Sequence, residues 1–89
     1  MRTPQRTSQF KKDVRLALRR GKDSEKLEQV LSVLIDGKPL DPKYKDHPLK
    51  GEFKGRRECH IDPDWLLIYK LDEDAIIFER TGSHSDLFE

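Results

Sequence analysis

The sequence predicts an α+β domain in which a helical hairpin packs on a mainly antiparallel four-stranded sheet. Three observations support this class. Apolar residues recur at helical spacing only in the first half of the chain, and they alternate or cluster as in strands in the second half. A proline-rich stretch separates the two halves. The predicted order is strand, helix, helix, strand, strand, strand, and 89 residues indicate a single domain spanning 1–89.

The first predicted elements are an extended segment and a helix. Residues 2–7 are polar and are expected to be extended. Ser8 is the expected N-cap of the first helix, because a serine hydroxyl can accept a hydrogen bond from a free backbone N–H of the first turn. Gly21 suits the position just after the helix, where a left-handed residue is common. The apolar stripe of this helix consists of Phe10, Val14, Ala17 and Leu18.

The second predicted helix begins after an N-cap at Asp23 or Ser24 and ends before Gly37. Its short connection to the first helix predicts an antiparallel helical hairpin. We expect its stripe to be buried against apolar residues of the sheet. The stripe is Leu27, Val30, Leu31 and Leu34, and the expected sheet partners are Leu67, Tyr69, Ile76 and Phe78.

The rest of the chain is predicted to be a loop, three strands and a tail. Residues 38–50 contain three prolines and are expected to form a loop, which in so small a domain is often functional. Alternation over residues 53–61 predicts a strand, with Phe53, Cys59 and Ile61 on one face. Residues 65–71 and 75–81 then form a hairpin about the acidic turn 72–74, and residues 83–89 form a short tail.

The charge distribution is asymmetric. Residues 1–57 carry a balance of +8 and residues 58–89 a balance of −7, although the whole chain is at +1. The basic part suggests a polyanionic partner such as RNA, although solvated helix faces would give the same count. No apolar run is long enough to span a bilayer, and no signal peptide is visible. Cys59 is the only cysteine, so no internal disulfide can form, and a cytoplasmic protein without membrane contact is expected.

The three histidines are the candidate chemical groups. His47 lies in the loop, His60 near a strand end and His84 in the tail, so either they share a site or they are unrelated surface residues. Imidazole titrates near neutral pH, so one ring can act as base and another as acid in a metal-free ribonuclease. Such a site also needs cations for the phosphate. The candidates for RNA binding are Lys45, Lys50, Lys54, Arg56 and Arg80.

Three further side chains have alternative interpretations. Asp64 could orient an imidazole or hold its proline-containing turn. Trp65 is expected to pack in the core, whereas Phe88 could seal the core edge or stack on a base. A zinc site built from Cys59 and the histidines is disfavoured, because Cys59 and His60 are adjacent on a strand and point to opposite faces.

Three stretches of the second half together resemble the YafQ toxins of the RelE/ParE superfamily. The first is YKDHPL at residues 44–49, followed by Gly51, Gly55 and Arg57. The second is HIDPDWLLIYK at residues 60–70, and the third is FERTGSH at residues 78–84, followed by Leu87 and Phe88. They cover about half of the chain, and their combination is specific although each piece alone is weak.

The resemblance implies a RelE-like fold and the toxin half of a type II toxin–antitoxin pair. Members of this family enter the ribosomal A site and cleave the bound mRNA by metal-free acid–base catalysis, so neither a metal ion nor a cofactor is expected. Arg80 matches a basic residue beside the scissile phosphate, and Phe88 an aromatic contact to RNA. The implied catalytic residues are His47, His60, Asp64 and His84.

The implied partners are the ribosome, mRNA and a cognate antitoxin similar to DinJ, whose complex with the toxin binds operator DNA. We expect an acidic or amphipathic antitoxin segment to wrap the helix pair over the basic residues of 11–20.

For the chemistry, His84 is the first candidate for the general acid. His60, backed by Asp64, is the candidate base, and His47 acts with either. The expected ends are a 2′,3′-cyclic phosphate or 3′-phosphate and a 5′-hydroxyl. The main alternative is a ParE-like toxin that binds DNA gyrase and needs no histidine cluster. An interaction module without activity is the third.

Overall fold

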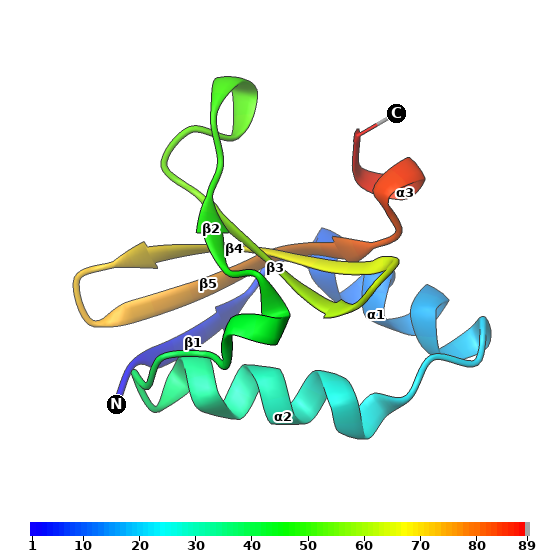
Figure 1. Ribbon diagram of the computed structural model, residues 1–89, viewed down its shortest axis with the longest axis horizontal. Helices are drawn as coiled ribbons and strands as arrows, with labels where there is room; N and C mark the ends of the chain where they lie inside the picture. The colour runs from blue at the N-terminus through cyan, green and yellow to red at the C-terminus, as the bar shows by residue number, and fades with distance from the viewer. Residues whose placement is uncertain (89) are drawn as a thin grey trace.

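The computed structural model describes residues 1–88, and it confirms the α+β class (Figure 1). One five-stranded sheet has the order β1-β5-β4-β3-β2. Strand β1 (Thr3–Arg6) is parallel to β5 (Ala75–Gly82), and the other neighbouring pairs are antiparallel. The central strand is β4 (Trp65–Asp72), and its neighbours are β5 and β3 (Arg57–Asp62).

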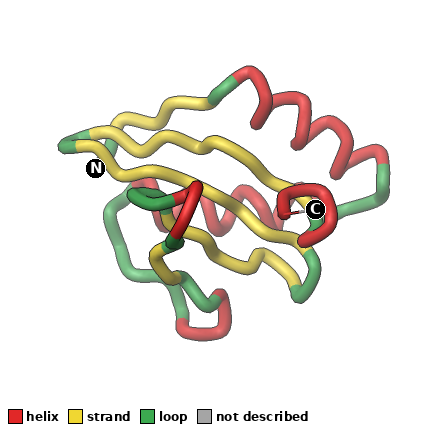
Figure 2. Tube along the Cα trace, turned by 90° about the horizontal axis from the view of Figure 1, so that it is seen from above, coloured by secondary structure: helices red, strands yellow, loops and turns green. Residues whose placement is uncertain are grey.

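Two long helices, α1 (Ser8–Arg19) and α2 (Ser24–Ile35), follow β1 and run in opposite directions, as the hairpin prediction required (Figures 1 and 2). The N-cap prediction for α1 was wrong by one residue. Thr7 is the cap: its hydroxyl oxygen accepts from the Phe10 N–H at 2.9 Å, and the hydroxyl lies 2.9 Å from the Glu79 carbonyl oxygen, to which it donates. Thr7 thereby joins the helix start to β5, a contact that helix propensity cannot reveal.

The predicted core of the helix face is confirmed except at Leu18 of α1, which is 44% exposed. Both long helices pack on one side of the sheet, where α2 contributes its whole leucine and valine stripe. The sheet supplies buried residues from β3, β4 and β5, and Trp65 is buried among them as expected. The buried sheet residues of this helix face are Cys59, Ile61, Trp65, Leu67, Tyr69, Ile76 and Phe78.

A second, smaller cluster covers the opposite face of the sheet. Leu66 and Ile68 of β4 are buried there beneath Leu87, with Leu49, Phe53 and Phe88 packed at the rim. These covering residues come from the loop before β3 and from the C-terminal helix α3 (His84–Phe88). Both segments rise from the side of the sheet opposite α2 (Figure 1).

The expected loop and the start of the next strand differ from the prediction. Residues 38–56 contain two 3₁₀ turns, η1 (Pro42–Tyr44) and η2 (Gly51–Phe53), and a two-residue strand β2 (His47–Pro48) that makes the fifth strand. Strand β3 begins at Arg57 rather than at Phe53, because Gly51 and Gly55 adopt positive φ values of 68° and 90° that break the extended backbone. Phe53 therefore packs on the opposite face and not beside Cys59.

The C-terminal part is more ordered than predicted. The hairpin of β4 and β5 forms as expected, but β5 bulges, because Ile68 pairs with Arg80 and Tyr69 with Phe78. The expected tail 83–89 contains α3, and its last residue, Glu89, lies outside the described residues. Within residues 1–88 no helix has the length and apolarity needed to cross a membrane.

Candidate active site

The short strand β2 brings two histidines together on a buried carboxylate. Its register places His47 opposite Glu58 on β3, and His60 lies two residues further along the same strand. Nε2 of His60 is 3.2 Å from Glu58 Oε1, and Nε2 of His47 is 3.7 Å from the same oxygen. Only 8% of the Glu58 side chain is exposed, against 47% for His47 and 27% for His60. A shielded anion therefore sits between two accessible imidazoles, whose ring centroids are 6.3 Å apart.

The hydrogen bonds of these rings define which nitrogens are available for proton transfer. Nδ1 of His47 donates to the Lys45 carbonyl at 2.6 Å, so in the neutral ring Nε2 can accept a proton. Nε2 of His60 lies 3.2 Å from Glu58 Oε1, an ion-pair distance for the protonated ring, and Nδ1 lies on the other side of the imidazole. Nε2 of His47 faces the same carboxylate oxygen at 3.7 Å, so both Nε2 atoms lie toward Glu58, and Nδ1 of His60 is the ring nitrogen left for a substrate.

Glu58 was missed in the sequence analysis, although a signal was present. Residues i and i+2 of a strand share a face, so Glu58 is on the same side of β3 as His60. The carboxylate beside His60 is this residue and not Asp64. The pairing of Glu58 with His47 could not be predicted from the sequence, because it depends on the two-residue strand β2.

His84 is the first residue of α3, a five-residue helix. Ser83 and Asp86 form a reciprocal capping box: the Ser83 N–H donates to Asp86 Oδ2 at 2.9 Å, and the Asp86 N–H donates to the Ser83 hydroxyl at 3.1 Å. The guanidinium of Arg20, at the end of α1, also donates to Asp86 Oδ2 at 2.7 Å. One carboxylate therefore fixes the helix that carries His84 and ties it to α1.

Asp64 also acts on this helix. Its Oδ1 accepts from the backbone N–H of His84 at 3.2 Å. This bond satisfies an N–H at the start of α3, where a negative side chain is favoured by the helix dipole. In this structure Asp64 thus holds the backbone of His84, whereas the sequence suggested that it would back the imidazole of His60.

Packing completes the position of α3. Gly82 lies so close to Asp86 that a Cβ at this position would be 3.0 Å from both Asp86 Cβ and Oδ2, which leaves no room for a larger residue without movement. Leu87 is buried on the opposite face of the sheet. The Phe88 ring lies 5.4 Å from that of Phe53 and 5.0 Å from that of His84, so it both seals the core edge and borders the histidine.

The two groups of side chains share one face of the sheet. Strand register places His60 opposite Leu66, and Leu66 opposite Gly82, in one row across β3, β4 and β5. Two strand spacings separate the Cα atoms of His60 and Gly82 by about 10 Å. His84 follows two residues after Gly82, so all three histidines belong to the face that the long helices leave uncovered.

The five predicted RNA-binding cations fall into two groups. Lys45, Lys50 and Lys54 are exposed on the segments around β2 and η2. The two arginines are already paired with carboxylates. Arg56 binds Glu79, which also raises the pKa of the guanidinium, and Arg80 binds the buried Asp13 of α1 at 2.8 Å. To bind an RNA phosphate, either arginine would have to leave its carboxylate or contact the phosphate and the carboxylate at the same time.

Two other polar groups near the site have structural roles. Burial raises the pKa of the Cys59 thiol far above its usual range, so Cys59 stays protonated and unreactive. Burial, followed by a 2.6 Å hydrogen bond to Asp46, also raises the pKa of Tyr69. Asp46 also pairs with Arg57 of β3, so this residue, which directly precedes His47, is anchored to both β3 and β4.

Among residues 1–88, no group of three or more His, Cys, Asp or Glu side chains is arranged to hold a metal ion.

Comparisons with known proteins agree with this architecture. A curated relative, the mRNA interferase toxin YafQ of Escherichia coli strain K12, is 51% identical over 83 residues, which are 92% of this chain and 90% of the relative. A crystal structure of the E. coli DinJ–YafQ complex has a chain with a TM-score of 0.93 and 48% identity, with full coverage of both chains. A copper-bound L66S mutant toxin from Helicobacter pylori has a TM-score of 0.94 and 43% identity, with 99% of this chain and 100% of that one covered.

The fold and the histidine-bearing face thus define a bacterial toxin of the type II toxin–antitoxin class. One family with the description "Bacterial toxin of type II toxin-antitoxin system, YafQ" matches residues 2–89. The chain belongs to this YafQ family, as the resemblance of its three sequence stretches had implied.

Proposed function

We propose that the protein is a ribosome-dependent endoribonuclease that cleaves mRNA in the A site by metal-free acid–base catalysis and so inhibits translation. One observation carries the proposal: two histidines share the buried Glu58, and α3 carries His84 on the same face of the sheet, opposite the two long helices. The 51% identical relative is itself an mRNA interferase toxin, which supports this activity over gyrase binding.

In the proposed reaction His60 is the base. Its Nδ1 takes the proton of the 2′-hydroxyl, and the carboxylate of Glu58 at Nε2 stabilises the imidazolium that results. The 2′-oxygen forms a bond to phosphorus while the bond to the 5′-oxygen breaks. His84 gives a proton to that leaving oxygen. The products are a 2′,3′-cyclic phosphate and a 5′-hydroxyl.

The other proposed catalytic residues support this exchange. His47 supplies a second imidazole beside Glu58, which in the proposed reaction acts together with His60 or His84. Asp64 keeps His84 in place through its backbone N–H. Exposed lysines on the β2 and η2 segments and the ring of Phe88 are proposed to hold the RNA, as the family resemblance implies.

The proposed partners follow from the same comparison. The solved DinJ–YafQ complex supports a cognate antitoxin as the protein partner, and the ribosome and its mRNA are the proposed targets. The complex with the antitoxin is proposed to bind operator DNA. An enzyme that acts on translating ribosomes works in the cytoplasm, which is the proposed location.

The decisive experiment incubates the purified toxin with translating ribosomes and maps the mRNA ends. We expect cleavage within the A-site codon, with a 5′-hydroxyl on the downstream fragment. A supercoiling assay with DNA gyrase is the control for the ParE-like alternative. Intact mRNA together with inhibited gyrase would reverse the assignment.

The metal-free mechanism has its own test, because the related H. pylori toxin binds copper. Cleavage is measured after dialysis against EDTA and again after addition of copper or zinc. We expect the EDTA-dialysed toxin to keep full activity when it is returned to ribosomes in magnesium buffer, since imidazoles alone supply both proton transfers. Loss of cleavage by the dialysed toxin, with recovery on addition of copper or zinc, would refute this mechanism.

A further inference from the structure

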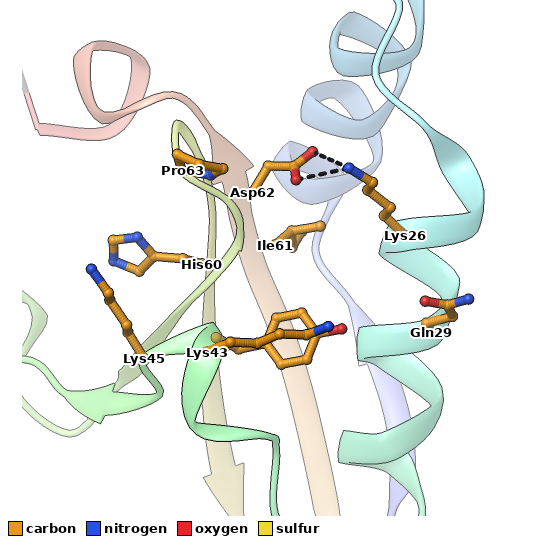
Figure 3. Close-up of a pocket in the computed structure, with 9 residues that line it drawn as sticks. Lys26, Gln29, Lys43, Lys45, His60, Ile61, Asp62 and Pro63 are labelled. Carbon is orange, nitrogen blue, oxygen red and sulfur yellow. Dashed lines mark hydrogen bonds and ion pairs between the residues drawn. The ribbon is translucent and has the colours of Figure 1, made fainter.

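A groove of about 450 Å³ lies beside the histidines, on the side of β3 that faces α2 (Figure 3). Its walls are Lys26 and Gln29 of α2, residues 43–45 at the end of η1, and residues 60–63 at the end of β3. His60 belongs both to this groove and to the cluster around Glu58. A ligand bound in the groove would therefore contact a proposed catalytic residue, His60.

The groove carries an excess of positive charge. Lys26 is neutralised by Asp62, whose carboxylate oxygens lie 2.9 and 3.2 Å from Nζ, and this hydrogen bond raises the pKa of Lys26. Lys43 and Lys45 have no carboxylate within 4.0 Å in the part of the chain that the structure describes. The ammonium of Lys43 instead lies over the Tyr44 ring, 5.2 Å from its centroid. Two cations are thus available at the mouth of the groove.

Two other hollows of the surface have the opposite character, and a third, between α1 and α3, has mixed charge because its cations stand beside Asp13, Asp64 and Asp86. One is bordered by Asp72, Glu73 and Asp74 at the β4–β5 turn, and another by Glu25 and Glu28 on α2. A polyanion would be repelled by both. The contrast selects the groove beside His60 for a phosphate-bearing ligand.

The segment with the two lysines is held in place before any ligand arrives. The Asp41 side chain accepts from the Lys43 N–H at 3.0 Å and caps η1, where Pro42 fixes the first turn. The Lys45 N–H donates to the Pro42 carbonyl, and Lys45 closes the turn in a left-handed conformation with φ of 51°. Tyr44 packs on the main core. A fixed turn loses little entropy on binding.

We propose that this groove binds the RNA strand next to the cleaved phosphate, with Lys43 and Lys45 each on a backbone phosphate. The proposal rests on the proposed ribonuclease function and extends it to residues with no role in proton transfer. Lys26 stays with Asp62 and forms the far wall. The ligand class is single-stranded RNA, whose phosphates come either from the mRNA or from ribosomal RNA.

The test compares two double variants that each remove two positive charges. Lys43→Gln with Lys45→Gln changes the groove, and Arg6→Gln with Lys38→Gln changes two exposed cations outside the groove as the matched control. Both are made in a His84→Ala background, so that RNA is bound without being cleaved. The probes are a fluorescent oligoribonucleotide, ribosomes programmed with mRNA, and ribosomes without A-site mRNA, each titrated at several salt concentrations.

We expect the groove variant to weaken binding of the oligoribonucleotide by about tenfold at low salt and to lower the salt slope by about 1.4, the value for two single-strand phosphates. The control should match the parent. Weakening with ribosomes alone, equal with and without mRNA, would assign the groove to ribosomal RNA and keep the ligand class.

Unchanged binding to all three RNA probes would overturn the proposal. The antitoxin is titrated beside the RNA probes, and weakened binding to the antitoxin alone would overturn the proposal in favour of an acidic polypeptide. Circular dichroism checks that both variants keep the parental fold. Because these are binding measurements, they remain decisive even if the wild-type toxin fails to cleave mRNA, so the groove and the proposed function can fail separately.

Discussion

The carboxylate of Asp86 offers a direct test of how the helix with His84 is held. The Ser83 N–H first, and then the Arg20 guanidinium, lower the pKa of Asp86 from 3.8 to about 2. A difference of nearly two pKa units corresponds to roughly 2 kcal/mol. Half of the Arg20 side chain is exposed, at 49%, so solvent screening reduces the expected value to about 1–2 kcal/mol.

The pH dependence follows from the sign of this shift. A carboxylate with a lowered pKa binds fewer protons in the folded protein than in the unfolded one. Its stabilisation is complete above the unfolded pKa of about 4 and disappears as the pH falls through about 2. Asp86→Asn should therefore lower the free energy of unfolding by about 1–2 kcal/mol at pH 7 and much less near pH 2.

The measurement is urea unfolding of wild type and variant across pH 2–7. Asp74→Asn, at the exposed β4–β5 turn, is the control, because Asp74 makes no side-chain ion pair in residues 1–88. A loss that is equally large at pH 2 and pH 7 would mean that the charge of Asp86 is irrelevant. No loss at pH 7 would remove Asp86 as the anchor of α3.

Four further predictions test the core, the site and the partner surface. Leu31→Ala should cost about 2–5 kcal/mol in urea unfolding, and a cost of only a few tenths would contradict its buried position. Glu58→Gln should lower single-turnover cleavage on the ribosome by roughly 10²-fold, because the imidazolium of His60 loses its anion; a wild-type rate would exclude that role. His84→Ala should lower the same rate by about 10²–10⁴-fold and leave ribosome binding nearly intact, whereas unchanged cleavage from saturated ribosomes would remove it from catalysis. Charge reversal at Lys11, Lys12 and Arg15 should weaken the antitoxin complex in a titration, and unchanged affinity would place the footprint elsewhere.

The regular part of the fold could be predicted from local patterns. The apolar stripe of α2 and the hairpin of β4 and β5 each bury a face that their own periodicity reveals. Gly21 and Gly37 were correctly placed after the helices, where φ values of 87° and 76° suit glycine. These features depend on residues that are close to each other in the chain, so local sequence patterns are sufficient to predict them.

The segment before β3 could not be predicted in the same way. Its alternation resembled a strand, yet Gly51 and Gly55 turn the chain so that Phe53 reaches the opposite face. Strand β2 is only two residues long and contains Pro48, which is tolerated because β2 lies at the sheet edge. No propensity marks such a strand, although it is what places His47 beside Glu58.

The candidate residues were found by chemistry and by resemblance, but their connections needed the structure. That three histidines lie on one face follows from strand register and from α3, which a tail of seven residues did not suggest. Asp64 was noted for an imidazole and instead holds a backbone N–H. Glu58 was overlooked although its spacing of two residues from His60 put both side chains on one face of β3.

The charge asymmetry of the chain also has a structural explanation. Several acidic residues of the second part pair with basic residues of the first, as Asp62 does with Lys26, Glu79 with Arg56 and Asp86 with Arg20. These pairs tie α1 to α3, and α2 and the loop to the sheet, and they cancel cations that the sequence counts as available. The positive charge left for the proposed RNA ligand is therefore more local than the balance of +8 suggests. It includes the exposed lysines around η1, beside His60. By neutralising cations elsewhere, the acidic part of the sequence confines the free positive charge to the proposed binding surface.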